Sequence, residues 1–349
     1  MPNDNILIIG QGLAGTALAF ALIEKGLSVH IIDDTHATAS SLVGIAVINP
    51  VTGRRYAKSW NIDELLSHAP ERYARIGNLL GKEYLSPVSI YQVLADARVE
   101  EIWMLRAADP EFQPYLDKEI ITLSSPGLRN LRCAEIHRAF HLQVSALIHD
   151  SAKWFAKQKI LIQEVFEPKA MQVLSNGITY KGHNYDHIIF CEGHRVLRNS
   201  LFSNLEIYPM KGEYLICRIP GLALTQHIKF GISLIPLPEM DVYWCGATYD
   251  RYNQNPSPTD AGRSYILNHL KEIVHIPFTV AHHGVGIRAT TRDRRPYVGT
   301  HPDYPRVHAI AGLGTKGASL APYCAMAITE YLDNGKIIPD EVQILRHSG

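Results

Sequence analysis

The sequence predicts an α/β fold, in which a Rossmann-like nucleotide-binding domain is assembled from separate segments of the chain. Two strand–glycine turn–helix units favour this fold, one around Gly10 and one around Gly314. A third observation is the run of aromatic and β-branched strands between 207 and 285, which Pro and Gly residues divide. This run predicts a second, α+β domain with a mainly antiparallel sheet.

The first 34 residues follow the order strand, glycine turn, helix, strand and acid, which is typical of a dinucleotide-binding βαβ unit. Gly10 permits the tight turn, Gly12 lets the backbone approach a pyrophosphate, and Gly15 lets the helix pack closely on the strand. Free N–H groups at the start of the helix favour phosphate binding. Asp33 ends the second strand, where a carboxylate can accept hydrogen bonds from ribose hydroxyls and disfavours a 2′-phosphate. The motif by itself is compatible with FAD or NAD.

Composition limits the class of protein. The 349 residues suit one large domain or two medium ones, and 34 basic and 34 acidic residues argue against a large nucleic-acid surface. Five scattered cysteines without a C-x-x-C pair predict reduced thiols and no metal site. No apolar run reaches a membrane span, and the first strand begins where a signal or transit peptide would stand, so we expect a cytoplasmic protein without membrane contact.

The middle of the chain alternates helical and extended patterns. Apolar residues at helical spacing predict helices within 61–118, and the alternation resumes after a detour, which predicts a discontinuous nucleotide domain. The other expected elements are strands at 89–93, 140–144, 160–165, 177–180 and 185–193, a helix at 146–157 with Ser145 as N-cap, strands at 214–219, 227–236 and 242–249, and a helix at 261–273.

These elements predict a division into two domains. Segments 1–60, 130–205 and 285–349 are expected to form the nucleotide-binding domain, and segments 61–129 and 206–284 the substrate domain.

A second glycine turn follows a strand at 307–311 and opens a helix that runs to about residue 332. Gly312, Gly314 and Gly317 form this turn, and its amides can face an electron-rich group such as a flavin edge. Near the first turn, Ser40 and Ser41 offer hydroxyl groups to a pyrophosphate. The apolar loop that begins at Gly44 either lies along a flat ring or is an ordinary transition from loop to strand.

Taken together, these motifs resemble those of the D-amino-acid oxidase superfamily of FAD-dependent oxidoreductases, which includes glycine and sarcosine oxidases. The similarity covers nearly the whole chain in order. The segments that carry it are Gly10–Gly15 with Asp33, Ser40/Ser41 with Gly44, Asp186–Gly193, Pro209–Glu213, Gly246–Thr248, Gly286-x-Arg288, Thr291–Gly299 and Gly312–Pro322.

The resemblance implies an enzyme that oxidises a C–N bond of an amine, with hydride transfer to FAD. Covalent members of the family carry a cysteine near the C-terminal motif, and none stands between Cys245 and Cys324, so non-covalent FAD is expected. Val165 resembles a family contact on the adenine side. The expected cofactor-binding residues are Gly10, Gly12, Leu13, Ala14, Gly15, Asp33, Asp34, Ser40, Ser41, Gly44, Ile45, Val165, Gly193, Gly312, Gly314, Thr315, Lys316 and Gly317.

Arg288 and Lys316 are the candidate catalytic residues. Arg288 matches the family arginine that binds a substrate carboxylate, a role that suits the bidentate guanidinium; the alternative is a structural arginine in a charged loop. Lys316 either stabilises anionic reduced flavin and substrate or is a surface lysine at a helix start. Tyr243 and Tyr249 line the pocket or belong to the core of the sheet.

The last third of the chain is also similar to the oxidoreductase half of the bifunctional enzyme that modifies the wobble uridine of tRNA. We therefore expect a small amine or amino-acid-like substrate, with tRNA as a less favoured partner because the net charge is zero. Ser233 stands near a tyrosine of glycine-oxidase-like members, which weakens the case for a simple amino acid. The remaining alternatives are a non-catalytic flavin-binding protein and an NAD-linked dehydrogenase. The sequence gives no oligomeric state.

Overall fold

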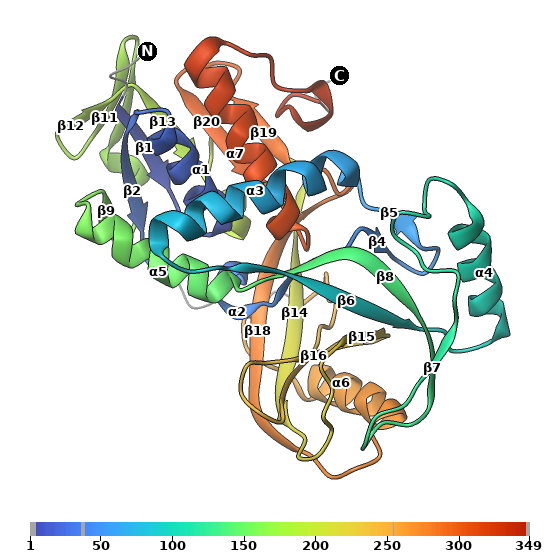
Figure 1. Ribbon diagram of the computed structural model, residues 1–349. Helices are drawn as coiled ribbons and strands as arrows, with labels where there is room; N and C mark the ends of the chain where they lie inside the picture. Colours follow the sequence, from blue (N-terminus) through green and yellow to red (C-terminus); the bar gives the residue numbers. More distant parts are fainter. Residues whose placement is uncertain (1–4, 36–38, 254, 347–349) are drawn as a thin grey trace.

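The computed structural model describes residues 5–35, 39–253 and 255–346. Two sheets organise this part of the chain, a six-stranded sheet with the order β19-β20-β13-β1-β2-β9 and a nine-stranded sheet with the order β18-β14-β17-β16-β15-β6-β8-β3, in which β7 adds to β8. Figure 1 shows the six-stranded sheet with its helices at the upper left and the nine-stranded sheet below and to the right.

The six-stranded sheet is parallel except at β19. Ile8 lies between Ile31 of β2 and Ile189 of β13, and all three side chains are buried. Continuous apolar runs are typical of parallel strands, since helices cover both faces. The strands are β1 (Asn5–Ile9), β2 (Ser28–Asp33), β9 (Leu161–Gln163), β13 (His187–Phe190), β19 (Tyr297–Thr300) and β20 (Val307–Ala311).

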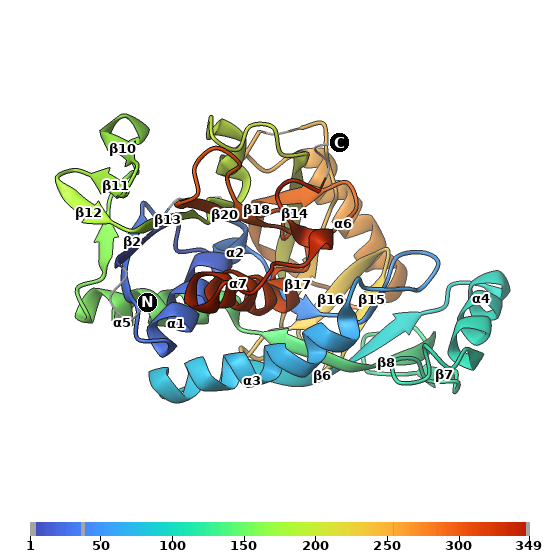
Figure 2. The same ribbon diagram turned by 90° about the horizontal axis from the view of Figure 1, so that it is seen from above.

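Helix α1 (Leu13–Glu24) is the central helix of this domain. Its residues from Leu13 to Leu22 are all buried, because β1, α5 (Val144–Lys157) and α7 (Gly317–Asn334) pack around it. Figure 2 shows α1 and α7 side by side. Helix α3 (Ile62–Leu80) packs against α7, where the Tyr73 hydroxyl donates a 2.8 Å hydrogen bond to the carbonyl of Ala318.

The nine-stranded sheet is antiparallel except between β6 and β15. Helix α6 (Asp260–Ile273) covers one of its faces with Ile266 and Leu270. The strands are β3 (Ala46–Ile48), β6 (Leu85–Val93), β7 (Ile121–Leu123), β8 (Leu131–Leu142), β14 (Ile207–Arg218), β15 (His227–Phe230), β16 (Ile232–Pro236), β17 (Val242–Gly246) and β18 (Thr279–Thr291).

Smaller elements connect the two sheets. They are α2 (Ser40–Val43), α4 (Ala97–Ala108), the pair β4 (Val51–Thr52) and β5 (Ala57–Lys58), the three-stranded sheet β10 (Met171–Leu174), β11 (Gly177–Tyr180) and β12 (His183–Tyr185), and short 3-10 helices at Pro168–Ala170, Gly193–Arg198 and Asp340–Val342.

Several local predictions differ from the structure. Ser145 is not an N-cap, because α5 already begins at Val144 and its N-cap Gln143 makes no side-chain capping bond. The strand predicted at 227–236 is a hairpin, since Gly231 with φ +40° turns the chain between β15 and β16. The predicted division into domains stays a prediction. Strands β3 and β8 lie within segments assigned to the nucleotide-binding domain, and the structure places them in the nine-stranded sheet. Strand β18 crosses the predicted boundary at residue 285.

A buried ionic network joins β14 to the α6 side of the nine-stranded sheet. The Nζ atom of Lys211 lies 3.1 Å from Oε1 of Glu213 and donates to the carbonyl of Ser257 at 2.7 Å. Thr259 donates its hydroxyl to the same carboxylate at 2.8 Å, and Nε2 of His283 lies 2.9 Å from it. Every charge of this network therefore has a partner, as burial requires.

Within the described ranges, no helix combines the length and apolar character that a membrane crossing needs.

His308 on β20 predicts a specific dependence of stability on pH. Its buried ring lies 2.9 Å from both Nδ1 of His187 and the hydroxyl of Thr300, and burial, with the nearby His187 next, lowers its pKa to about 3. Below pH 6.5 the unfolded chain therefore binds a proton that the folded chain does not. The free energy of unfolding should fall by roughly 2 kcal/mol between pH 7 and pH 5 from this residue alone.

In His308→Gln this loss should disappear, so that denaturant unfolding at pH 7 and pH 5 gives a smaller difference than in the wild type. His275→Gln, at an exposed position, is the matched control and should keep the wild-type difference. An unchanged pH dependence in His308→Gln would contradict the assignment.

Candidate cofactor and active site

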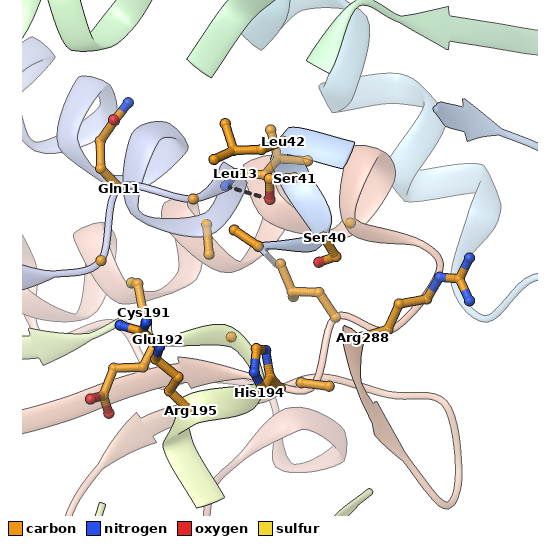
Figure 3. A pocket seen from close by; sticks show the side chains of 18 of the residues that line it. Gln11, Leu13, Ser40, Ser41, Leu42, Cys191, Glu192, His194, Arg195 and Arg288 are labelled. Atoms are coloured by element: carbon orange, nitrogen blue, oxygen red, sulfur yellow. Dashed lines mark hydrogen bonds between the residues drawn. The ribbon is translucent and has the colours of Figure 1, made fainter. Parts of the chain in front are cut away.

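A cavity of about 530 Å³ lies where the first glycine turn, α2 and the second glycine turn meet the nine-stranded sheet. Figure 3 shows side chains from these separate segments around it. Gly15 and Lys316 do not line the cavity. The predicted residues that do line it are Gly10, Gly12, Leu13, Ala14, Asp33, Asp34, Ser40, Ser41, Gly44, Ile45, Val165, Gly193, Arg288, Gly312, Gly314, Thr315 and Gly317.

The first glycine turn needs glycine for two separate reasons. Gly10 has φ +100°, and a Cβ atom there would lie 2.5 Å from the carbonyl oxygen of Cys191. A Cβ atom at Gly15 would lie 1.9 Å from the carbonyl oxygen of Gly10. Gly15 therefore acts through the close packing of α1 on the turn, which explains why it does not line the cavity.

The two acids at the end of β2, Asp33 and Asp34, occupy different environments. Asp33 accepts hydrogen bonds of 2.6 Å from the backbone N–H groups of Gln11 and Thr35, so its carboxylate holds the turn against the strand. Asp34 accepts a 2.6 Å hydrogen bond from Nη1 of Arg195, which follows β13. Arg195 also lines the cavity, and no local signal in the sequence connects it with Asp34.

Helices α1 and α7 start at the cavity without a capping side chain from the N-cap residue. Gly12 precedes α1 and Lys316 precedes α7; neither helix has a side-chain cap or an acid in its first turn. The Oγ atom of Ser41 accepts one α1 amide, that of Leu13, at 3.1 Å (Figure 3). The partial positive charge of two helix N-termini is thus directed at one cavity, a setting that favours anionic groups.

Arg288 lies at the sheet side of the cavity. Its guanidinium occupies the space over Gly212, where a Cβ atom would lie 2.3 Å from Nη1, and it lies 5.3 Å from the centre of the Tyr249 ring. Nη1 is buried, and it has no hydrogen-bond partner among the described residues. Burial lowers the pKa of this guanidinium, although arginine stays charged at neutral pH.

Lys316 lies at the start of α7, next to Thr315, which lines the cavity. Burial lowers the pKa of its ammonium group to about 8, with the charges of Arg294 and Lys229 as the smaller causes. Lys229 has no signature in the sequence, because β15 and α7 are far apart along the chain.

The aromatic residues of the sheet divide between core and cavity. Trp244 lines the cavity, and its ring stacks on Tyr214 at 5.6 Å. Tyr243 faces the core, where its hydroxyl accepts the amide of Leu224 at 3.3 Å. Tyr249 is 68% exposed and contacts Arg288, so it is not the core residue that one interpretation of the sequence favours.

The donor set and shape fit FAD. The N-termini of α1 and α7, which have no N-cap side chain, can face an anionic group of the cofactor. Val165, an apolar residue that is 62% exposed, also lines the cavity and offers a surface on which a ring can pack. The glycine turns leave backbone rather than side chains at both ends. The site therefore has the features of a flavin-binding enzyme, with a buried arginine at its sheet side.

The family model described as DAO, FAD dependent oxidoreductase, matches residues 5–331. The chain therefore belongs to this family and its cofactor is FAD. It is 24% identical to the tRNA 5-methylaminomethyl-2-thiouridine biosynthesis bifunctional protein MnmC of Marinobacter nauticus, over 95% of this chain and 55% of that protein. A glycine oxidase of Bacillus licheniformis is 27% identical over 39% of this chain and 38% of that protein.

Among the relatives, the first ones matched are much longer than this chain, which spans about half their length. Two solved structures share the fold: glycine oxidase from Geobacillus kaustophilus, with a TM-score of 0.78, 19% identity and coverage of 100% of both chains, and iminodiacetate oxidase (IdaA) from Chelativorans sp. BNC1, with a TM-score of 0.77, 20% identity and coverage of 97% of this chain and 98% of that one.

Replacement of Gly10 should show that the first turn needs glycine for its close backbone contact and not only for its positive φ. Gly10→Ala places a methyl group against the carbonyl of Cys191, so the purified variant should contain little flavin. Gly26→Ala is the matched control, because Gly26 has φ +77° but no atom lies within 4 Å of the place that a Cβ atom would occupy. It should lose about 1 kcal/mol of stability and keep its flavin. The ratio of flavin to protein absorbance measures the flavin content of both variants. Equal flavin content in the two variants would contradict the role of Gly10.

Proposed function

We propose that this FAD-dependent oxidoreductase oxidises the C–N bond of an amine that carries a carboxylate. The observation that carries the proposal is Nη1 of Arg288, which is buried at the edge of the cavity without a partner among the described residues. A buried donor without a partner costs free energy, and a carboxylate satisfies a guanidinium with two parallel hydrogen bonds.

The residues around the cavity have different roles in the proposed oxidation. When bound, FAD would supply the two-electron oxidation that converts the amine C–N bond to an imine, which water would hydrolyse to a carbonyl compound and the released amine. Arg288 fixes the carboxylate, and Gly212 keeps the space that the guanidinium needs. Trp244 limits the cavity on the sheet side and excludes water there. Such chemistry needs orientation more than acid–base groups.

The start of α7 contributes positive charge to the same side. Its amides have no side-chain cap, and Lys316 stands at the N-cap position. With a pKa of about 8, Lys316 is mostly protonated at pH 7 and favours negative charge that develops at the cofactor or on the substrate.

We also propose that the glycine turns, α2 and Val165 hold the cofactor non-covalently. Cys191 is the one cysteine among the residues that line the cavity in the described part of the chain, and burial raises the pKa of its thiol, so it carries little reactive thiolate. Acid precipitation of the purified protein should therefore leave the flavin in the supernatant. Flavin that stays with the precipitated protein would contradict non-covalent binding.

A second candidate function comes from the relatives named MnmC. Those proteins are named for the biosynthesis of tRNA 5-methylaminomethyl-2-thiouridine, and the corresponding reaction here would remove a carboxymethyl group from a wobble-uridine aminomethyl nitrogen. The carboxylate of that group also suits Arg288. The zero net charge does not favour tRNA binding, which depends on phosphate neutralisation.

Anaerobic reduction of the bound flavin tests the proposals directly. Glycine, sarcosine, D-amino acids and a carboxymethylaminomethyl-uridine nucleoside are mixed with the purified protein, and the flavin absorbance band in the blue region is followed. Bleaching by an amino acid supports the first function, and bleaching by the modified nucleoside alone supports the second. A flavin that no amine bleaches would favour a non-catalytic flavin-binding protein.

The substitution Arg288→Leu should lower kcat/KM for a carboxylate-bearing amine by roughly 100-fold or more, because the charge-assisted pair is lost while the cavity keeps its shape. Flavin content should stay unchanged. Arg292→Leu, at an exposed position of the next loop, is the matched control and should keep wild-type kinetics. Unchanged kinetics in Arg288→Leu would remove its assigned role.

A further inference from the structure

The face of the nine-stranded sheet that carries Arg288 continues over four more strands. The order runs from β18 through β14, β17 and β16 to β15. Tyr214 of β14 lies opposite both Gly284 of β18 and Gly246 of β17. Arg288 follows Gly284 by four residues, and side chains alternate along a strand, so Arg288 and Tyr214 point to the same face.

The same row ends at a lysine. Gly246 lies opposite Ser233 of β16, and Ser233 lies opposite Lys229 of β15, so the Lys229 side chain shares the face of Arg288. The neighbours of Lys229 along the strand confirm its direction, because Ile228 and Phe230 pack in the core under α6 on the other face. Lys229 is half-buried and does not itself line the cavity.

Aromatic rings separate the two cations. Tyr214 and Trp244 are stacked on β14 and β17, between the strands of Arg288 and Lys229, and Val43 and Ile45 pack over them from the α2 side. The two cationic strands are four strand spacings apart, roughly 19 Å in a flat sheet, and two long side chains that reach toward each other shorten this gap to the length of a small extended ligand.

Lys229 contributes to the electrostatic environment of Lys316. Burial is the main cause that lowers the pKa of Lys316 to about 8, and the charges of Arg294 and Lys229 add to it; burial also lowers the pKa of Lys229 to about 8. No carboxylate of the described residues is among the groups that shift the pKa of Lys229 or Lys316. Lys229 of β15 and Lys316 at the start of α7 are thus two half-buried positive charges without a carboxylate to neutralise them.

The opposite face of the sheet shows how this fold treats a lysine with a structural role. Lys211 is fully buried, and Glu213 and the carbonyl of Ser257 satisfy it. Buried charges without partners are costly and are concentrated at functional sites. Lys229 and Lys316 lack that local solution, so an anionic partner from outside the chain is the simplest one.

We propose that Lys229 and Lys316 form a second anion-binding subsite across the aromatic rings from Arg288, and that the substrate is an amine with two anionic groups, one on each side of its nitrogen. This inference rests on the proposed amine oxidation and narrows its substrate class. The second group is a carboxylate or a phosphate-type oxyanion, since a lysine ammonium binds either as a point charge.

Dead-end ligands in which sulfur replaces the amine nitrogen test this subsite without turnover. The holoenzyme is titrated with (methylthio)acetate and (propylthio)acetate, which have one charge, and with thiodiacetate, 3-(carboxymethylthio)propanoate and (phosphonomethylthio)acetate, which have a second anionic group. The shift of the flavin absorbance band reports the dissociation constants. At least one ligand with two anionic groups should bind roughly 10- to 100-fold more tightly than both singly charged ligands, and the preferred one distinguishes carboxylate from phosphonate.

Lys229→Met should abolish this preference and leave the affinity for (methylthio)acetate within about twofold, because the variant removes charge and keeps side-chain length. Lys271→Met, at an exposed position on α6, is the matched control and should keep the preference. If Lys229→Met does not fold, Lys229→Gln takes its place, with the same expected loss of the preference.

The outcomes separate the inference from the function on which it rests. If (methylthio)acetate binds in an Arg288-dependent way but ligands with a second anionic group bind no more tightly, the subsite is wrong and the amine-oxidase proposal stands. The same holds if the preference survives Lys229→Met. If no carboxylate perturbs the flavin and no amine bleaches it, the proposed function fails as a whole.

Discussion

The close contact of three backbone segments under the first glycine turn determines where everything else in the molecule lies. Gly15 of α1 approaches the carbonyl of Gly10, and Gly10 approaches the carbonyl of Cys191 at the end of β13. A side chain at either glycine would push the helix or the neighbouring strand away. Because α1 is buried between the sheet, α5 and α7, such a shift would pass to the second glycine turn as well. The contact therefore controls both ends of the cofactor site.

Local patterns in the sequence are sufficient for the nucleotide-binding half. The apolar run of β1, the glycine spacing and Asp33 act within one βαβ unit, so nearest neighbours in sequence are also neighbours in space. The family and its cofactor follow from several such units in order, and the match over residues 5–331 agrees with them. Arg288 is predicted in the same way, through its motif and not through its surroundings, and its role stays a prediction.

Features that depend on pairing between distant segments escape prediction. Strand β8 is expected only over its last residues, because its first part alternates weakly and gains its place from β6 and β7. The contact of Asp34 with Arg195 joins positions 161 residues apart. Gly212 is part of a recognised motif, yet its purpose depends on an arginine from the adjacent strand. Such contacts depend on the register between strands, which cannot be predicted from any single segment of the sequence.

The two faces of the nine-stranded sheet treat positive charge in opposite ways, and the contrast gives the site its chemical character. On the α6 side, Glu213 neutralises Lys211 and contacts His283, so that face contributes stability. On the opposite face, Arg288 lines the cavity with a buried Nη1 atom that has no partner among the described residues, and no carboxylate is among the causes that shift the pKa of Lys229. These unpaired charges are the basis of the proposed anionic ligand, because a buried charge without a partner is costly and an anion would neutralise it. The same charges oppose the burial of a cationic amine, so the proposed substrate would bind with its amine neutral.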